Sequence, residues 1–146
     1  MASIDYLAIE NSIKTLLNAG SATSGYNVFV EPPEAVRTDA CPLVQIYLNS
    51  WDSPAEDELI GGTNPITTFL TIELWIYDFS MENLAGATAR DIMLDNVKGV
   101  MKANRTLADK VLITRFAGGE FDNQKNNKGM GFFKGVSLRL ECEVRE

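Results

Sequence analysis

The sequence of 146 residues contains no histidine and only two cysteines, Cys41 and Cys142. Without histidine, the chain cannot form the serine–histidine or cysteine–histidine pairs of nucleophilic enzymes, and it lacks the commonest general base near neutral pH. The two cysteines do not have the spacing of a metal site or of a CxxC motif. We expect both thiols to be buried and reduced rather than joined in a disulfide, because we expect a reducing compartment. These absences exclude such nucleophile pairs and most zinc sites.

The sequence also lacks a long apolar run, a leader segment and a phosphate-binding motif. No apolar run approaches the roughly 20 residues that span a bilayer. The first residues, MASIDYLAIENSIKTLL, have no basic region and carry Asp5 and Glu10 within an apolar pattern, which is atypical of a signal peptide. The glycine-rich segment GMGFFK follows a turn instead of opening a helix, so it predicts no nucleotide site. We therefore expect a protein that acts in a cytoplasm, without a membrane and without a cofactor.

The composition is that of a globular domain with an acidic surface. Apolar residues make up 45% and charged residues 23% of the chain, and its length predicts one domain over residues 1–146. There are 13 basic and 20 acidic residues, which give a net charge of −7. A surface of that sign repels phosphate, so we expect no tight binding to nucleic acid.

Two helices are predicted from apolar residues at helical spacing. The first runs from Ile4 to Asn18, with Ser3 as its N-cap and Gly20 as part of its stop signal. The second follows Ser80, an N-cap candidate, and ends near Asn104.

Five segments alternate apolar and polar residues as strands do. They are YNVFV, PLVQIYLNSW, ITTFLTIELWIYDF, KVLITRFAGGEFD and FFKGVSLRLECEVRE. The two prolines after YNVFV place it at a sheet edge. The last two segments flank a turn, FDNQKNNKGMG, and are predicted to form a hairpin. The order α-β-β-β-α-β-β predicts an α+β two-layer sandwich, with a mostly antiparallel sheet and both helices packed on one face.

Aromatic residues on the predicted polar strand face are the first candidate site. Trp75 and Tyr77 lie opposite the apolar row of their strand, Phe133 lies opposite Phe132, and Trp51 opens a long loop. Exposed aromatic patches commonly mark protein partners. The alternative is that loops or the first helix cover these side chains.

The acidic loop from Trp51 to Pro65 is the second candidate. Its length favours a functional role, and it carries an apolar pair that a free loop would leave in water. Its carboxylates are able to hold a hard cation but lack EF-hand spacing, so a solvated loop is the simpler interpretation. The acidic residues are Asp52, Glu56, Asp57 and Glu58, and the apolar pair is Leu59 and Ile60.

The order of these segments resembles the tail terminator, or tail completion, proteins of long-tailed bacteriophages over nearly the whole chain. The likeness rests on the helix IDYLAIENSIKTLLNA, the strand PLVQIYL, the acidic loop, the strand ITTFLTIELWIYDF, the helix from Glu82 to Asn104 and the closing strand FFKGVSLRLECEVRE. It implies a ring, usually a hexamer, that caps the tail tube protein, docks the head-tail connector protein and lets DNA pass through its lumen. It implies no catalytic residues.

Such a ring needs two different complementary patches on each subunit, because its interfaces are heterologous. The acidic loop and the lysines Lys125 and Lys128 are one candidate pair. The alternatives are another phage neck or connector protein, a tail tube subunit, or a small cytoplasmic ligand-binding domain or enzyme that uses the aromatic face.

Overall fold

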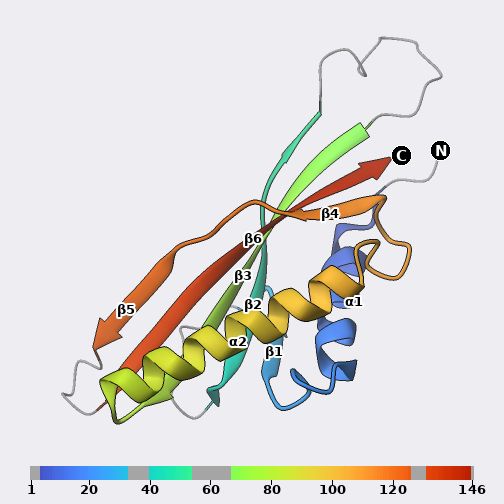
Figure 1. The fold of residues 1–146 in the computed structure, drawn as a ribbon. Coiled ribbons are helices and arrows are strands. Elements are labelled where there is room, and N and C mark those ends of the chain that lie inside the picture. Colours follow the sequence, from blue (N-terminus) through green and yellow to red (C-terminus); the bar gives the residue numbers. More distant parts are fainter. Residues whose placement is uncertain (1–3, 33–39, 54–66, 126–130, 146) are drawn as a thin grey trace, which may run out of the picture.

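The computed structural model describes residues 4–32, 40–53, 67–125 and 131–145, which form two helices and a six-stranded sheet (Figure 1). The elements in chain order are α1 (Tyr6–Ala19), β1 (Asn27–Val30), β2 (Leu43–Asp52), β3 (Thr67–Ser80), α2 (Asn83–Ala103), β4 (Ile113–Phe116), β5 (Phe121–Lys125) and β6 (Phe132–Arg145).

The sheet has the strand order β1-β2-β3-β6-β4, and β5 also pairs with β6. The β1–β2 pair is parallel, and all other described pairs are antiparallel. The predicted α+β class is confirmed, and so is the edge position of β1. The long strands β3 and β6 pair over their whole lengths and form the axis of the sheet.

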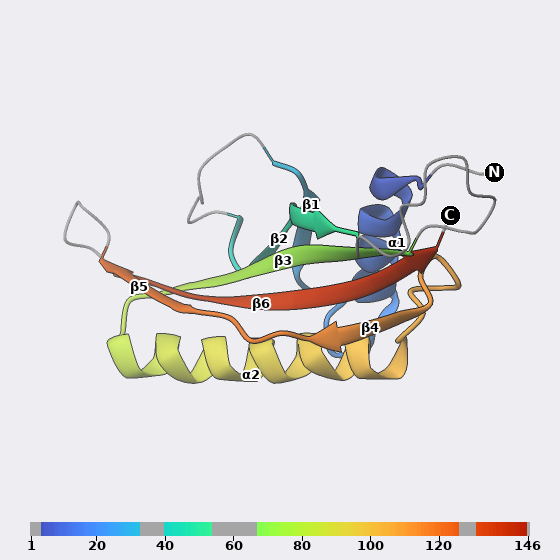
Figure 2. The same ribbon diagram turned by 90° about the horizontal axis from the view of Figure 1, so that it is seen from above.

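One face of the sheet is covered by the helix layer, and we call it the covered face. Figure 2 shows α2 lying along one side of β3 and β6. The side chains of Ile72, Leu74 and Leu140 on this face are fully buried, because both helices and the sheet share one apolar core. The helices contribute Ile9, Ile13 and Leu17 from α1 and Met93, Val97 and Met101 from α2.

The helix boundaries differ slightly from the predicted ones. The N-cap of α1 is Asp5, whose carboxylate accepts a hydrogen bond from Ala8 N at 3.0 Å, so the prediction of Ser3 as the cap is wrong. Ser80 does not cap α2 directly, because its hydroxyl accepts from Glu82 N one residue before the helix. The stop at Gly20 and the end of α2 at Asn104 are confirmed.

The predicted final hairpin has a divided first arm. Its residues form two short strands, β4 and β5, with a break at residues 117–120 where Gly118 has a φ of 91°. At Gly119 an added Cβ would lie 1.8 Å from Ser137 O, so the chain crosses β6 too closely for a side chain there. Residues 121–125, predicted to belong to the turn, therefore pair with β6 as a strand.

A β-bulge at Asn49 changes the face of the sheet towards which the last side chains of β2 point. Leu48 pairs with Ile72, but Ser50 pairs with Thr71, so one residue of β2 is left out of the register. Trp51 consequently lies opposite Leu70 within the strand and on the covered-face side. The prediction that Trp51 opens a loop is wrong, because β2 continues to Asp52.

Candidate assembly surface

The face of β3 and β6 turned away from α2, here called the open face, carries a row of aromatic side chains. The rings of Trp75 and Tyr77 stack at 6.1 Å between centroids, and those of Phe79 and Phe133 meet edge to face at 5.3 Å. All four side chains are half-buried. The structure therefore brings together three of the predicted interface residues, Trp75, Tyr77 and Phe133, on one surface.

The Tyr77 ring lies flat on the neighbouring strand. A Cβ added to Gly135, its partner on β6, would come within 2.4 Å of the ring. The Tyr77 hydroxyl donates to Asp122 on β5 at 3.2 Å. Burial, helped by the Asp122 carboxylate, raises the pKa of Tyr77 above its usual range, so the phenol stays protonated. This ring is held by its own sheet, and part of its surface is covered before any partner binds.

A polar network centred on Glu73 adjoins the aromatic row. Its carboxylate accepts from Trp75 Nε1 at 3.3 Å and from Asn49 Nδ2 at 3.4 Å, and it pairs with Arg139 Nε at 3.6 Å. The Arg139 Nε atom is buried and makes no hydrogen bond within the described part of the chain. Further along β6, Arg115 pairs with Glu141 at 3.6 Å and with Glu143 at 3.4 Å. The open face thus presents aromatic rings beside arginines, the residue types that are enriched at protein interfaces, together with the carboxylates that pair with these arginines.

The remaining predicted interface residues do not join this row. Trp51 is 65% exposed and lines a pocket of about 190 Å³ with Tyr6, Leu48 and Leu70 on the covered-face side. Trp51 and the open-face aromatics therefore do not share one face of the sheet, so they do not form the single interface that we expected. Glu56, Asp57, Glu58, Leu59, Ile60 and Lys128 lie outside the described residues, as does the side chain of Lys125 at the end of β5.

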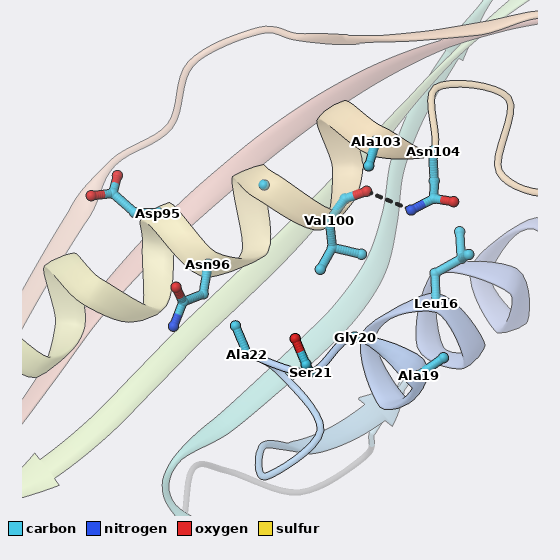
Figure 3. Close-up of a pocket in the computed structure, with 11 residues that line it drawn as sticks. Leu16, Ala19, Gly20, Ser21, Ala22, Asp95, Asn96, Val100, Ala103 and Asn104 are labelled. Carbon is cyan, nitrogen blue, oxygen red and sulfur yellow. Dashed lines mark hydrogen bonds between the residues drawn. The ribbon is translucent and has the colours of Figure 1, made fainter.

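A groove of about 480 Å³ separates the end of α1 from the second half of α2 (Figure 3). Asn104 Nδ2 donates to Val100 O at 2.8 Å on one wall, and Figure 3 shows Asp95 pointing away from α1. Small residues line both walls, namely Ala19, Gly20, Ser21, Ala22, Gly99 and Ala103. No group of three or more potential metal ligands occurs in the described ranges.

A carboxyl pair of buried Glu10 and exposed Glu31 joins α1 to the edge of the sheet, and sequence reasoning missed it. Glu10 is 1% exposed, and its carboxyl interacts with that of Glu31, the residue after β1, while Glu10 Oε2 has no hydrogen-bond partner within the described part of the chain. Burial, followed by the bond to Glu31 and its charge, raises the pKa of Glu10 to about 8. Glu31 Oε1 also accepts from Leu48 N at 2.9 Å on β2. The signal in the sequence was Glu10 next to Ile9 within the apolar stripe of the first helix.

The structure also bears on the predictions for the two cysteines and for membrane-spanning segments. Cys142 is buried, its thiol lies 3.6 Å from the Thr114 hydroxyl, and burial raises the pKa of that thiol to about 11. Cys41 is half-buried, which corrects the expectation of a fully buried side chain. Within the described ranges, neither helix has the length and apolarity that a bilayer crossing requires.

Comparison with known proteins finds similar chains among the solved structures. No protein-family model matches the chain, and no curated protein sequence matches it. A solved structure described as "Virion of native gene transfer agent (GTA) particle" contains a chain with 12% identity and a TM-score of 0.43, with 94% of each chain covered. Both values are low, and this likeness by itself assigns neither a fold family nor an activity.

Proposed function

We propose that the chain is a structural protein of a bacteriophage-like particle. The observation that carries the proposal is the architecture: a helix, three strands, a second helix and a long closing strand form one two-layer domain, as the resemblance to tail terminators implies. The open face adds support, because half-buried aromatic rings and paired charges on a long sheet are suited to contact with other protein subunits.

Within that class, the chain is a tail terminator. Six copies form a ring that sits on the last tier of the tail tube, stops further addition of tube subunits and offers its other side to the head connector. The ring assembles in the host cytoplasm and remains in the neck of the virion. No residue is assigned a catalytic role.

The charge of the chain fits a passage for DNA. Each subunit carries a net charge of −7, and on the open face Glu73, Glu141 and Glu143 are paired with Arg139 and Arg115. If an excess of acidic groups lines the lumen, the wall repels the phosphate backbone and DNA slides without being held. A lumen dominated by arginine and lysine would contradict this part of the proposal.

The test is a nonsense mutation in this gene of the phage that encodes it, with particles examined by negative-stain electron microscopy. A terminator mutant yields tubes of uncontrolled length and filled heads without tails, and the wild-type gene supplied in trans restores virions. Normal virions from the mutant overturn the proposal. A mutant without any tubes identifies a tube subunit instead, and tails of normal length without heads identify a connector.

A further inference from the structure

One end of the sheet is four strands wide and has two open edges at the same level. The pairing places Trp51, Leu70, Cys142 and Thr114 in one row across β2, β3, β6 and β4. The edge strand β1 has ended by this level, because it pairs only with residues 43–46 of β2. Among the described residues, no strand lies outside β2 or outside β4 in this row. Unpaired edges of this kind are templates for a further strand.

The backbone of β2 exposes its hydrogen-bonding groups at Trp51. Nearer the middle of the strand the outward groups are already used, because Ile46 O accepts from Glu31 N and Leu48 N donates to the Glu31 carboxylate. The bulge at Asn49 shifts the alternation by one residue, so Trp51 and not Ser50 points its N–H and C=O away from β3.

The backbone of β4 exposes the matching groups at Phe116. Ala117 N donates to Arg139 O on β6, so by alternation Arg115 also faces β6 while Thr114 and Phe116 face outward. The carbonyl of Thr114 is already occupied, because it accepts from Arg105 Nη1 at 2.9 Å. Phe116 is therefore the outward residue of β4 whose two backbone groups are available.

We propose that the β4 edge of one copy pairs antiparallel with the β2 edge of the next copy, with Phe116 opposite Trp51. This proposal rests on the ring of the proposed function and assigns the junction between its subunits. The antiparallel direction follows from the number of strands. Neighbouring strands among β2, β3, β6 and β4 run in opposite directions, so β2 and β4 are antiparallel to each other. Rotation about the ring axis does not change which way a strand runs along that axis. An even number of alternating strands thus gives an antiparallel junction.

The side chains support this register. Trp51, 65% exposed, meets the half-buried ring of Phe116 on the covered-face side. On the open face, Asp52 stands opposite Arg115, whose existing ion pairs are long, at 3.4 and 3.6 Å. Aromatic pairs and opposite charges are favourable cross-strand neighbours. A register two residues away would place Ile113 opposite Asp52 and would direct Trp51 at the occupied carbonyl of Thr114.

The junction has a consequence for the lumen. A ring of six copies closes a continuous sheet of about 24 strands, more than the 16–18 that already leave an aqueous channel in single-chain barrels. Because α2 covers one face, the open face with Glu73 and its neighbours becomes the inner wall.

A disulfide tests the register directly. Asp52 and Arg115 form a non-hydrogen-bonded pair in the proposed junction, where opposing Cα atoms lie about 4.5 Å apart, within disulfide range. The variant Asp52→Cys/Arg115→Cys is oxidised and run on a non-reducing gel. We expect a ladder of covalent oligomers that ends at the ring and collapses on reduction. In the matched control, Asp52→Cys/Ile113→Cys, the second cysteine lies two residues away from the proposed partner position, so this variant should cross-link roughly tenfold less.

Native mass spectrometry of the same samples under reducing conditions separates the two proposals. A reduced ring without cross-links in Asp52→Cys/Arg115→Cys overturns the edge junction and leaves the terminator proposal standing. Stronger cross-linking in the Ile113→Cys control overturns the register. A chain that is monomeric at all concentrations and absent from virions overturns the ring and the junction together. The single variants and wild type define the background from Cys41 and Cys142, and thermal unfolding under reducing conditions confirms that each variant is folded.

Discussion

The two faces of the sheet are built from different side chains although they belong to the same strands. Along β3, Ile72, Leu74 and Ile76 on the covered face are fully buried, whereas Glu73, Trp75 and Tyr77 on the open face are half-buried. The covered face is aliphatic and closes the core, so it supplies most of the free energy of folding. The open face carries aromatic rings and paired charges that are only half-buried, so they contribute less to the core. The contrast between the two faces separates residues needed for folding from residues that are available to contact other chains.

Removing a covered-face side chain should have the largest effect on stability. Leu74→Ala removes a side chain that is 0% exposed, and we expect a loss of about 3–4 kcal/mol in the free energy of unfolding. Trp75→Ala, one residue away on the open face, should cost less than half as much, because that ring is only half-buried. Urea unfolding of monomeric protein measures both. Equal losses would show that the open face is part of the folding core.

Glu10 is an ionisable residue that is buried in the helix layer, and it should make the free energy of unfolding depend on pH. Its pKa is raised from the ordinary 4.5 to about 8, so the folded chain holds a proton that the unfolded chain releases between these values. The contribution of Glu10 to stability is therefore greatest below pH 4.5 and falls towards pH 8, by at most about 1.4 kcal/mol per pH unit for one proton. Glu10→Gln should remove this slope and raise the thermal midpoint at pH 8.

One control variant sharpens the Glu10 experiment. Glu120→Gln changes an exposed carboxylate and should leave the slope intact. A pH slope in Glu10→Gln equal to that of wild type would mean that the carboxyl pair with Glu31 does not set the dependence. The comparison uses thermal unfolding from pH 4.5 to 9 at constant ionic strength.

The aromatic row should be sensitive to a single added methyl group. Gly135→Ala places a Cβ within 2.4 Å of the Tyr77 ring, which must move off the strand, and we expect a loss of about 1–3 kcal/mol. Gly99→Ala is the matched control, because its Cβ meets nothing within 4 Å and the helical site favours alanine by up to about 1 kcal/mol. Combining Gly135→Ala with Tyr77→Ala should abolish the clash, so the two losses should not add.

The ion pairs of the open face should contribute least to folding. Arg115 and its partners Glu141 and Glu143 are 48%, 43% and 23% exposed, and pairs of this kind contribute about 0.2–1 kcal/mol. Arg115→Ala should therefore lower monomer stability by no more than this amount, and the loss should shrink in high salt. A loss as large as that of Leu74→Ala would remove the distinction between the two faces.

Periodicity predicted the fold because it reports which side chains are buried. Buried and less buried residues alternate from Thr68 to Tyr77 in β3 and from Leu138 to Arg145 in β6, so both faces were predicted there, including Trp75 and Tyr77 opposite the core. The alternation of faces gave the wrong face for Trp51, because the bulge at Asn49 moves every later side chain of β2 to the other face of the sheet. The break between β4 and β5 was also missed, since it depends on the close crossing of Gly119 over Ser137 and not on local preference.

The candidate surface was only partly predictable for a similar reason. The three open-face aromatics follow from strand parity alone, but the Glu10–Glu31 pair joins residues from a helix and a strand end that are distant in sequence. The outward backbone groups of Trp51 and Phe116 depend on how four strands pair, which no single segment encodes.

The contact between Glu31 and Leu48 bears on how the free chain stays in solution. Glu31 leaves β1 with a φ of 47°, and its carboxylate takes the N–H of Leu48 where a longer β1 would have supplied a carbonyl. An acidic group at the rim also repels other acidic chains at high protein concentration. Precipitation through stray strand pairing is thereby opposed along most of β2, and Trp51 remains as a short region where a neighbouring strand gains access.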